Sequence, residues 1–309
     1  MRIRIGLVLG LTLSAAYAQT DGPVLLAPEN RTQGSDSIAS RQRPFVSNVD
    51  VVLVPATITD PLGRFVTGLE KEHFQVFEDG VAQDIQYFYT QDTPISVGLI
   101  FDQSGSMSSV VDYSRTAAEE FMRTANPLDE FFLIAFSNKP KLVKDFTSRD
   151  DDITSQLMFT KAGGRTSLVD AIYLGLHNMR KAKYQRRAII VITDGGDNNS
   201  RYTTKETLRY LREADVQLYT IGIPGKDYAP YFLNQMAENS GGRVYDGFDW
   251  VDIASKISVE LRYQYVLGYR SRNRAHNGQW RKIKVKLKTP KGLPPLHAYY
   301  KTGYYSPED

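Results

Sequence analysis

Five oxygen-bearing side chains, spread over three segments of the sequence, could together bind a cation. Asp102, Ser104 and Ser106 form an Asp-x-Ser-x-Ser motif directly after an apolar run, Thr166 follows two glycines, and Asp194 ends another apolar run. Carboxylate and hydroxyl oxygens suit hard cations and are poor ligands for copper or zinc. We therefore expect these five residues to hold a divalent cation, with Mg²⁺ as the first candidate and Ca²⁺ or Mn²⁺ as alternatives.

The charge of this ligand set suggests what the ion would do. Two carboxylates balance a divalent cation without over-neutralising it, because the three hydroxyls are neutral. Such an ion keeps its Lewis acidity and at least one position held by exchangeable water. A carboxylate from a partner protein can take that position, so the chemistry that we expect is coordination.

The surrounding pattern predicts the elements that would position these residues. Short apolar strands alternate with segments of helical spacing, which is typical of an open, mostly parallel, doubly wound α/β sheet with helices on both faces. In such sheets ligands bind beyond the carboxyl ends of the strands, where all three segments fall. The expected strands are 95–101, 131–136, 142–146, 188–193, 216–223 and 243–245. The expected helices are one with Val110, Ala117, Phe121 and Ala125 on one stripe, 168–183, one starting near 203, 227–241 and 249–261.

Two β segments flank the α/β unit, and each is too small to be stable alone. Val51 to Ile58 reads as a strand buried on much of both faces, and Asp79-Gly80 is a tight hairpin signal between two further strands. After the unit, Ile283, Val285 and Leu287 alternate with lysines. We expect the segments to pair into one small β-sandwich into which the α/β unit is inserted. The strands expected are 51–58, 74–78, 85–89, 263–269, 281–288 and 297–304.

The five-residue pattern resembles the metal-ion-dependent adhesion site (MIDAS) of von Willebrand factor type A (VWA) domains. The resemblance implies that Ser104, Ser106 and Thr166 are direct ligands, and that Asp102 and Asp194 bind directly or through water. It also implies one short antiparallel strand at the edge of the sheet, for which 142–146 is the candidate. The family includes integrin inserted domains, so the resemblance implies a protein-binding module.

The flanks are similar to a bacterial group of exported VWFA-related proteins. This similarity supports architecture and export and names no ligand. The residues that carry it are Thr59-Asp60, Gly63-Arg64, Gly68-Leu69 and Glu78-Asp79-Gly80 before the unit, and Gln264-Tyr265-Val266-Leu267-Gly268-Tyr269 and Gly303-Tyr304-Tyr305 after it.

The first residues predict export. Arg2 and Arg4 precede an apolar run that is too short for a spanning helix of about 20 residues, and Ala16-Tyr17-Ala18 has small residues where a signal peptidase cleaves. We expect a cleaved signal peptide and a periplasmic or extracellular protein with no transmembrane segment in the mature chain; a buried helix and an uncleaved anchor are the alternatives. The expected division is a signal peptide (1–18), a flexible lead (19–45), an N-terminal sandwich segment (46–91), a VWA domain (92–262) and a C-terminal sandwich segment (263–305).

Composition narrows the remaining classes. The 309 residues are 41% hydrophobic and 24% charged, which is typical of a globular protein, and the net charge of +3 indicates no particular partner. Cysteine is absent, so disulfides, thiolate metal sites and cysteine nucleophiles are excluded. The four histidines are scattered without metal-ligand spacing, and no phosphate-binding loop or Gly-x-Ser-x-Gly elbow is present.

Three other features have a structural interpretation and a functional one. Asp197, Asn198 and Asn199 read as a solvated loop rather than extra ligands, and Asp151-Asp152 as a helix cap rather than a calcium site. The tail after Leu261 is basic, with eleven lysines and arginines against Glu308 and Asp309, and it reads as a solvated outer strand face on which lysine discourages edge pairing; binding to an anionic surface or an acidic partner is the alternative. The basic residues are Arg262, Arg270, Arg272, Arg274, Arg281, Lys282, Lys284, Lys286, Lys288, Lys291 and Lys301.

The function that we expect is an exported, metal-dependent protein-binding module that captures an acidic side chain of a partner. We do not expect an enzyme or a nucleic-acid-binding protein, because no general base, nucleophile or base-stacking platform is apparent. Two alternatives stay open: an exported metal-dependent hydrolase, and a scaffold whose metal only stabilises the fold.

Overall fold

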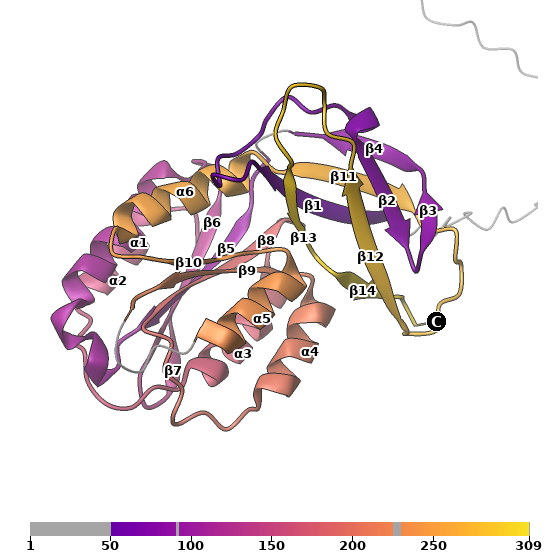
Figure 1. Ribbon diagram of the computed structural model, residues 1–309. Helices are drawn as coiled ribbons and strands as arrows, with labels where there is room; N and C mark the ends of the chain where they lie inside the picture. The colour runs from indigo at the N-terminus through magenta and orange to yellow at the C-terminus, as the bar shows by residue number, and fades with distance from the viewer. Residues whose placement is uncertain (1–50, 91–92, 225–229, 309) are drawn as a thin grey trace, which may run out of the picture. The chain divides into compact units, whose positions relative to one another are not determined.

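The computed structural model describes residues 51–90, 93–224 and 230–308. The expected signal peptide, the flexible lead and the expected helix start at Asp227 lie outside these ranges. The described residues form a six-stranded sheet with helices on both faces and two four-stranded antiparallel sheets (Figure 1). The predicted fold class, an α/β sheet with additional sheets made by strands on either side of it, is therefore confirmed.

The central sheet has the strand order β10-β9-β8-β5-β6-β7, and β7 is its antiparallel edge strand, as predicted. Every residue of β5 is buried, which explains its continuous apolar run, because a strand covered by helices on both faces has no solvated side. The strands are β5 (Ser96–Asp102), β6 (Glu130–Phe136), β7 (Pro140–Thr147), β8 (Arg187–Thr193), β9 (Gln217–Gly222) and β10 (Val244–Asp246).

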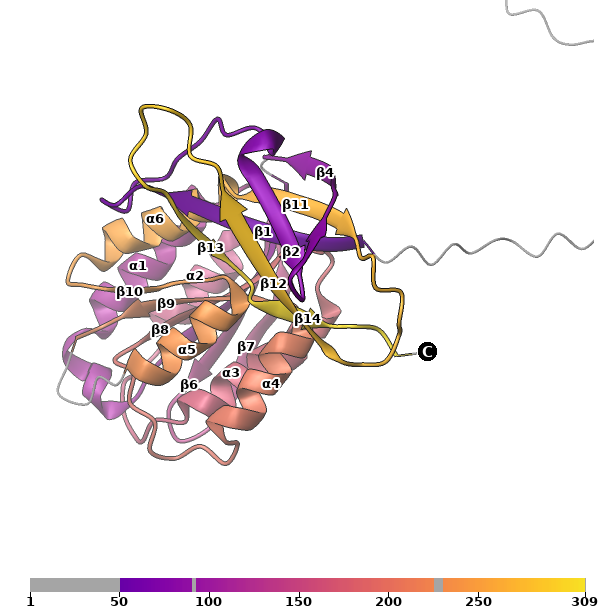
Figure 2. The ribbon, with the colours of Figure 1, turned by 45° about the vertical axis from the view of Figure 1, so that its right-hand side comes forward.

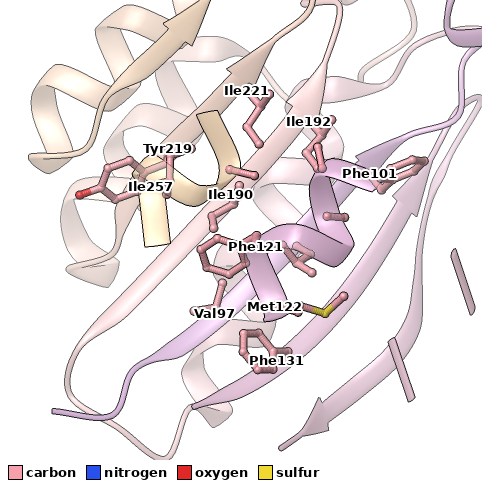
Figure 3. Close-up of a cluster of buried hydrophobic side chains, with 14 of the residues drawn as sticks. Val97, Phe101, Phe121, Met122, Phe131, Ile190, Ile192, Tyr219, Ile221 and Ile257 are labelled. Carbon is pink, nitrogen blue, oxygen red and sulfur yellow. The ribbon is translucent and has the colours of Figure 1, made fainter. Parts of the chain in front are cut away.

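Helices cover the two faces of this sheet in groups of three. One face packs against α1 (Val111–Thr124), α2 (Asp150–Met158) and α6 (Trp250–Arg262), and the other against α3 (Leu168–Asn178), α4 (Thr204–Ala214) and α5 (Pro230–Ser240). Figure 3 shows the first core, where Phe121 and Ile257 lie over strand residues such as Val97 and Ile190. In the described ranges, no helix has the length and apolar content that a bilayer crossing requires.

Two of the predicted features at helix ends are present in the structure, and two differ from the prediction. The predicted capping box of Thr203 and Glu206 is present, and α5 ends at Ser240, directly before Gly241, whose φ is +79°. The expected helix 168–183 stops at Asn178 and continues as a 3-10 turn over Met179–Lys181. Asp151 and Asp152 are not caps. They lie in the first turn of α2, where the positive end of the helix dipole stabilises carboxylates.

The flanking segments form two antiparallel sheets with a shared core, in the orders β13-β1-β11-β4 and β14-β12-β2-β3. Figure 2 shows β12 and β2 lying in front of β1 and β11. Asp79 and Gly80 both have positive φ, as the predicted hairpin requires. The strands are β1 (Val51–Thr59), β2 (Phe74–Glu78), β3 (Val81–Gln83), β4 (Ile85–Tyr89), β11 (Tyr265–Arg270), β12 (Trp280–Leu287), β13 (His297–Tyr300) and β14 (Gly303–Tyr305).

The single strand expected over 297–304 is wrong, because this segment divides between the two sheets. β13 pairs with β1, whereas β14 pairs with β12. Between them Lys301 forms a bridge with Ser240, and the Thr302 N–H donates to the Asn239 carbonyl at 3.3 Å. Contacts with the α/β unit therefore hold the two residues at which the chain passes from one sandwich sheet to the other.

The sandwich core contains one buried ion pair that joins the two flanking segments. A nitrogen of Arg281 lies 3.4 Å from Glu78, and the two side chains are only 4% and 2% exposed. The hydroxyls of Tyr269 and Tyr304 donate to Glu78 at 2.9 and 2.8 Å. Among the described residues, the side chains that bond to the Glu78 carboxylate all come from the C-terminal segment. The buried ion pair therefore forms only when both flanking segments are packed together.

Strands on either side of the α/β unit are direct neighbours. Tyr89 of β4 is the cross-strand partner of Val266 of β11, and β11 also pairs with β1. The chain therefore leaves the sandwich after β4 and returns to it at β11 beside the point of departure. Gln264 contacts both the sandwich and the α/β unit, because its amide donates to the hydroxyls of Thr57 and Tyr219 at 3.3 and 3.1 Å.

Candidate metal centre

The first loop of the candidate centre begins where β5 ends. Both carboxylate oxygens of Asp102 accept hydrogen bonds: Oδ1 from the Ser104 N–H at 2.8 Å and Oδ2 from the Thr193 hydroxyl at 2.6 Å. Ser104 is the N-cap residue of a 3-10 helix over Gly105–Ser109, but its hydroxyl does not cap that helix. Instead the hydroxyls of Ser104 and Ser106 lie 3.0 Å apart. The motif thus gathers its three side chains at the end of one strand.

The second loop, which carries Thr166, lies against the first. The Gly105 N–H donates to the Gly164 carbonyl at 3.0 Å, and the Gly163 N–H donates to the Gln103 carbonyl at 2.7 Å. A Cβ on Gly105 would lie 3.3 Å from the Gly164 oxygen, so a larger residue would push the loops apart. Gly164 has a φ of +88°, which favours glycine. The glycines therefore serve the close approach of the two loops.

The third loop begins with Asp194 after β8. Its preceding residue, Thr193, donates its hydroxyl to Asp102 and accepts the Gly195 N–H at 3.0 Å. Asp194 is buried, and no hydrogen-bond donor within the described residues reaches its Oδ1 atom. A buried carboxylate oxygen without a partner is costly, so it indicates a missing positive or donating group.

Two residues that we interpreted as a solvated loop join the second and third loops. The Thr166 N–H donates to Asn198 Oδ1 at 3.1 Å, and the Asn198 N–H returns a bond to the Thr166 carbonyl at 3.0 Å. Asp197 Oδ1 accepts the Leu168 N–H, at the start of α3, at 2.9 Å. Both side chains are exposed, as expected. Their role in holding the loop of Thr166 was not predicted from the sequence.

Asn138, which follows β6, is a further residue whose role was not predicted. Its Oδ1 accepts the Arg165 N–H at 2.8 Å, and its carbonyl accepts the side-chain N–H of Asn199 at 2.6 Å. The available signal was its position, because Asn138 follows a parallel strand at the same edge of the sheet as the five candidate residues.

The candidate centre concentrates negative charge in a buried place. Asp102 is fully buried, and this burial raises the pKa of its carboxyl to about 6. Hydrogen bonds from Thr193 and Ser104 partly oppose the rise in pKa, and the charge of Asp194 adds to it. A buried carboxylate whose ionisation is opposed by burial and by a neighbouring carboxylate is the electrostatic setting that a bound cation relieves.

The donor set is compatible with a hard divalent cation. No three histidine or acidic side chains cluster as a metal site in the described part of the chain, so an ion here must also use hydroxyl oxygens. Ser104, Thr166 and Asp194 are buried, whereas Ser106 is exposed, so the group has an open side. Because both oxygens of Asp102 already accept protein hydrogen bonds, water-mediated contact suits Asp102 and direct contact suits Asp194.

The family model for the von Willebrand factor type A domain matches residues 96–257. The chain therefore belongs to this family. The match spans the whole central sheet and includes all five candidate ligands. No curated protein matches the chain.

Solved structures of low sequence identity are similar to this chain. A von Willebrand factor type A protein from Catenulispora acidiphila has a TM-score of 0.50 at 13% identity, over 84% of this chain and 75% of that one. The vWF domain of the type V pili tip protein Mfa5 from Porphyromonas gingivalis has a TM-score of 0.47 at 12% identity, over 56% and 97%. The PilB minor pilin from Streptococcus sanguinis has a TM-score of 0.44 at 15% identity, over 58% of this chain and 63% of that one.

Proposed function

We propose that this protein is an exported protein-binding module that captures an acidic side chain of a partner through a divalent cation, Mg²⁺ in the first place. Ser104, Ser106, Thr166 and Asp194 would hold the ion, with Asp102 acting through water. The ion would supply the positive charge that attracts the partner's carboxylate. Binding, rather than catalysis, is the role that we assign to it.

One observation carries the proposal. Asp194 keeps a buried carboxylate oxygen that no donor of the described residues reaches, beside the charge of Asp102. A fold that needed these residues only for its own stability would be expected to pair that oxygen, since buried polar groups are almost always hydrogen-bonded. A cation that contacts Asp194 and the hydroxyls removes this cost, and its open side leaves room for a ligand.

The test is calorimetric titration of the folded protein with MgCl₂. Replacing both metal-site serines, Ser104→Ala with Ser106→Ala, is expected to weaken Mg²⁺ binding at least tenfold. The matched control replaces Ser108 and Ser109 by alanine. These two exposed serines lie in the 3-10 helix that contains Ser106, and this variant is expected to keep the Mg²⁺ affinity of the unchanged protein. Equal Mg²⁺ affinity in both double variants, or no Mg²⁺ binding by the unchanged protein, would contradict the metal site.

Affinity capture from envelope and secreted fractions extends the same test to the partner. We expect a protein that is retained in Mg²⁺, released by EDTA and absent when the Ser104→Ala, Ser106→Ala variant is the bait. A rise in melting temperature with Mg²⁺ but no EDTA-sensitive partner would favour the scaffold role instead.

A further inference from the structure

Exposed apolar side chains gather at the edge of the sheet that carries the candidate metal centre. Met158 and Phe159 end α2 and are 68% and 81% exposed, Phe248 precedes α6 and is 79% exposed, and Tyr113 in the first turn of α1 is 40% exposed. We call these four residues the apolar rim. All four lie at helix ends that face the carboxyl ends of the parallel strands, because α1 and α6 begin there and α2 ends there.

Contacts between neighbouring residues link the three helix ends that carry the apolar rim. The Tyr113 ring lies 4.8 Å from the ring of Trp250, two residues after Phe248. Arg115 Nε donates to the Thr160 hydroxyl at 3.0 Å, beside Phe159. α1 itself follows the 3-10 helix that carries Ser106. The apolar rim is therefore a band along the ends of α6, α1 and α2, on the side of the centre that Ser106 occupies.

The other side of the centre is basic. Arg165, directly before Thr166, is exposed and makes no ion pair within the described residues. Arg201, on the loop that follows Asp194, is also exposed, and its Nε lies 3.5 Å from Asp170. The loops that carry Thr166 and Asp194 thus each have an exposed arginine, whereas the helix ends of the apolar rim have exposed apolar side chains.

We propose that the partner of this centre is a protein segment in which the captured acidic residue has a large apolar residue beside it that packs on the apolar rim. This inference rests on the proposed metal-dependent function and names the chemistry of its partner. Exposed phenylalanine, tyrosine and methionine side chains that form one patch are typical of binding surfaces. Aromatic anchors supply much of the affinity at such surfaces. The arginines favour further acidic residues on the opposite side of the captured one.

The probe is a displayed library of random 12-residue peptides, selected on the full protein in Mg²⁺ and eluted with EDTA. We expect the eluted peptides to share one acidic residue with an aromatic or aliphatic residue within a few positions of it. The Phe159→Ala, Phe248→Ala variant is expected to bind a selected peptide at least tenfold more weakly while its Mg²⁺ affinity is unchanged. The control is Leu62→Ala with Val81→Ala, two residues of the flanking segments that are 78% and 52% exposed.

The outcomes separate this inference from the proposed function. Eluted peptides with an acidic residue but no apolar enrichment, or equal affinity of the apolar-rim variant and the unchanged protein, would overturn the inference alone. The absence of any EDTA-eluted acidic peptide would overturn both. Loss of peptide binding in the Leu62→Ala, Val81→Ala control would also overturn the inference, because it would place the contact on the sandwich.

Discussion

The hydrogen bonds of Asp102 show how one residue organises the candidate centre. Its two oxygens join the Ser104 backbone to the Thr193 hydroxyl, and Thr193 in turn accepts the Gly195 N–H. The side chain therefore aligns the ends of β5 and β8 whether or not an ion is bound. Asp194 is the carboxylate with an oxygen left for an ion.

Asn198 provides a prediction about a residue that is not itself a ligand. Replacing Asn198 by alanine removes the acceptor of the Thr166 N–H, so the Thr166 loop should be held less firmly. We expect Mg²⁺ affinity to fall several-fold and stability to fall by about 1 kcal/mol, which is the usual net contribution of one hydrogen bond. Calorimetric titration checks the affinity. Asn234→Ala, at an exposed position on α5, is the control, and an equal affinity in both variants would contradict this role.

The candidate ligands could be predicted from the sequence because their types, order and positions at strand ends are local features. The structure brings Asp102, Ser104 and Ser106 together and ties the loops of Thr166 and Asp194 to them. The roles of Asn138 and Asn198 could not be predicted in the same way. Their partners lie in other loops, and the loop conformation that makes the hydrogen bonds depends on the packed sheet.

At the scale of elements, the buried Glu78–Arg281 pair provides a stability prediction. Arg281→Met leaves Glu78 buried without a cationic partner, and breaking such a pair typically costs about 3–5 kcal/mol. We expect a loss of that order in the free energy of unfolding, measured with denaturant. Arg270→Met, at an exposed position on β11, should change it little. A loss below about 1 kcal/mol for Arg281→Met would show that the pair is dispensable.

Strand periodicity explains which elements could be predicted. The alternation of Ile283 and Val285 with lysines correctly gives the buried and exposed faces of β12. The division of 297–304 into β13 and β14 could not be seen, since Lys301 changes sheets through contacts with Ser240, far away in sequence. Local pattern determines which face is buried, whereas the choice of neighbouring strand is made by tertiary packing.

At the scale of the molecule, the two flanking segments should fold only together. In the sheet β13-β1-β11-β4, strands from the N-terminal and C-terminal segments alternate, so neither segment can form it alone. We expect residues 51–90 expressed alone to be unfolded by circular dichroism, and the same residues joined to 264–308 by a short Gly/Ser linker to show strand structure. The linker is feasible because Tyr89 and Val266 are cross-strand partners. A folded 51–90 fragment would contradict this interdependence.

The insertion itself could be predicted because each flanking segment was too short to bury a core. The partner chemistry that we propose could not, because it is argued from a surface made by three separate helix ends. Whether Phe159 and Phe248 are exposed depends on how the helices pack on the sheet, and a local sequence pattern does not determine that packing.

The neighbouring positions of β4 and β11 have a mechanical consequence. A pull on a partner held at the far edge of the central sheet would reach the sandwich through two covalent connections that enter adjacent strands. The tension would be shared between them, and twisting about either connection would be resisted by the other. Gln264, which donates to both Thr57 and Tyr219, adds a hydrogen-bonded link between the two parts at this place.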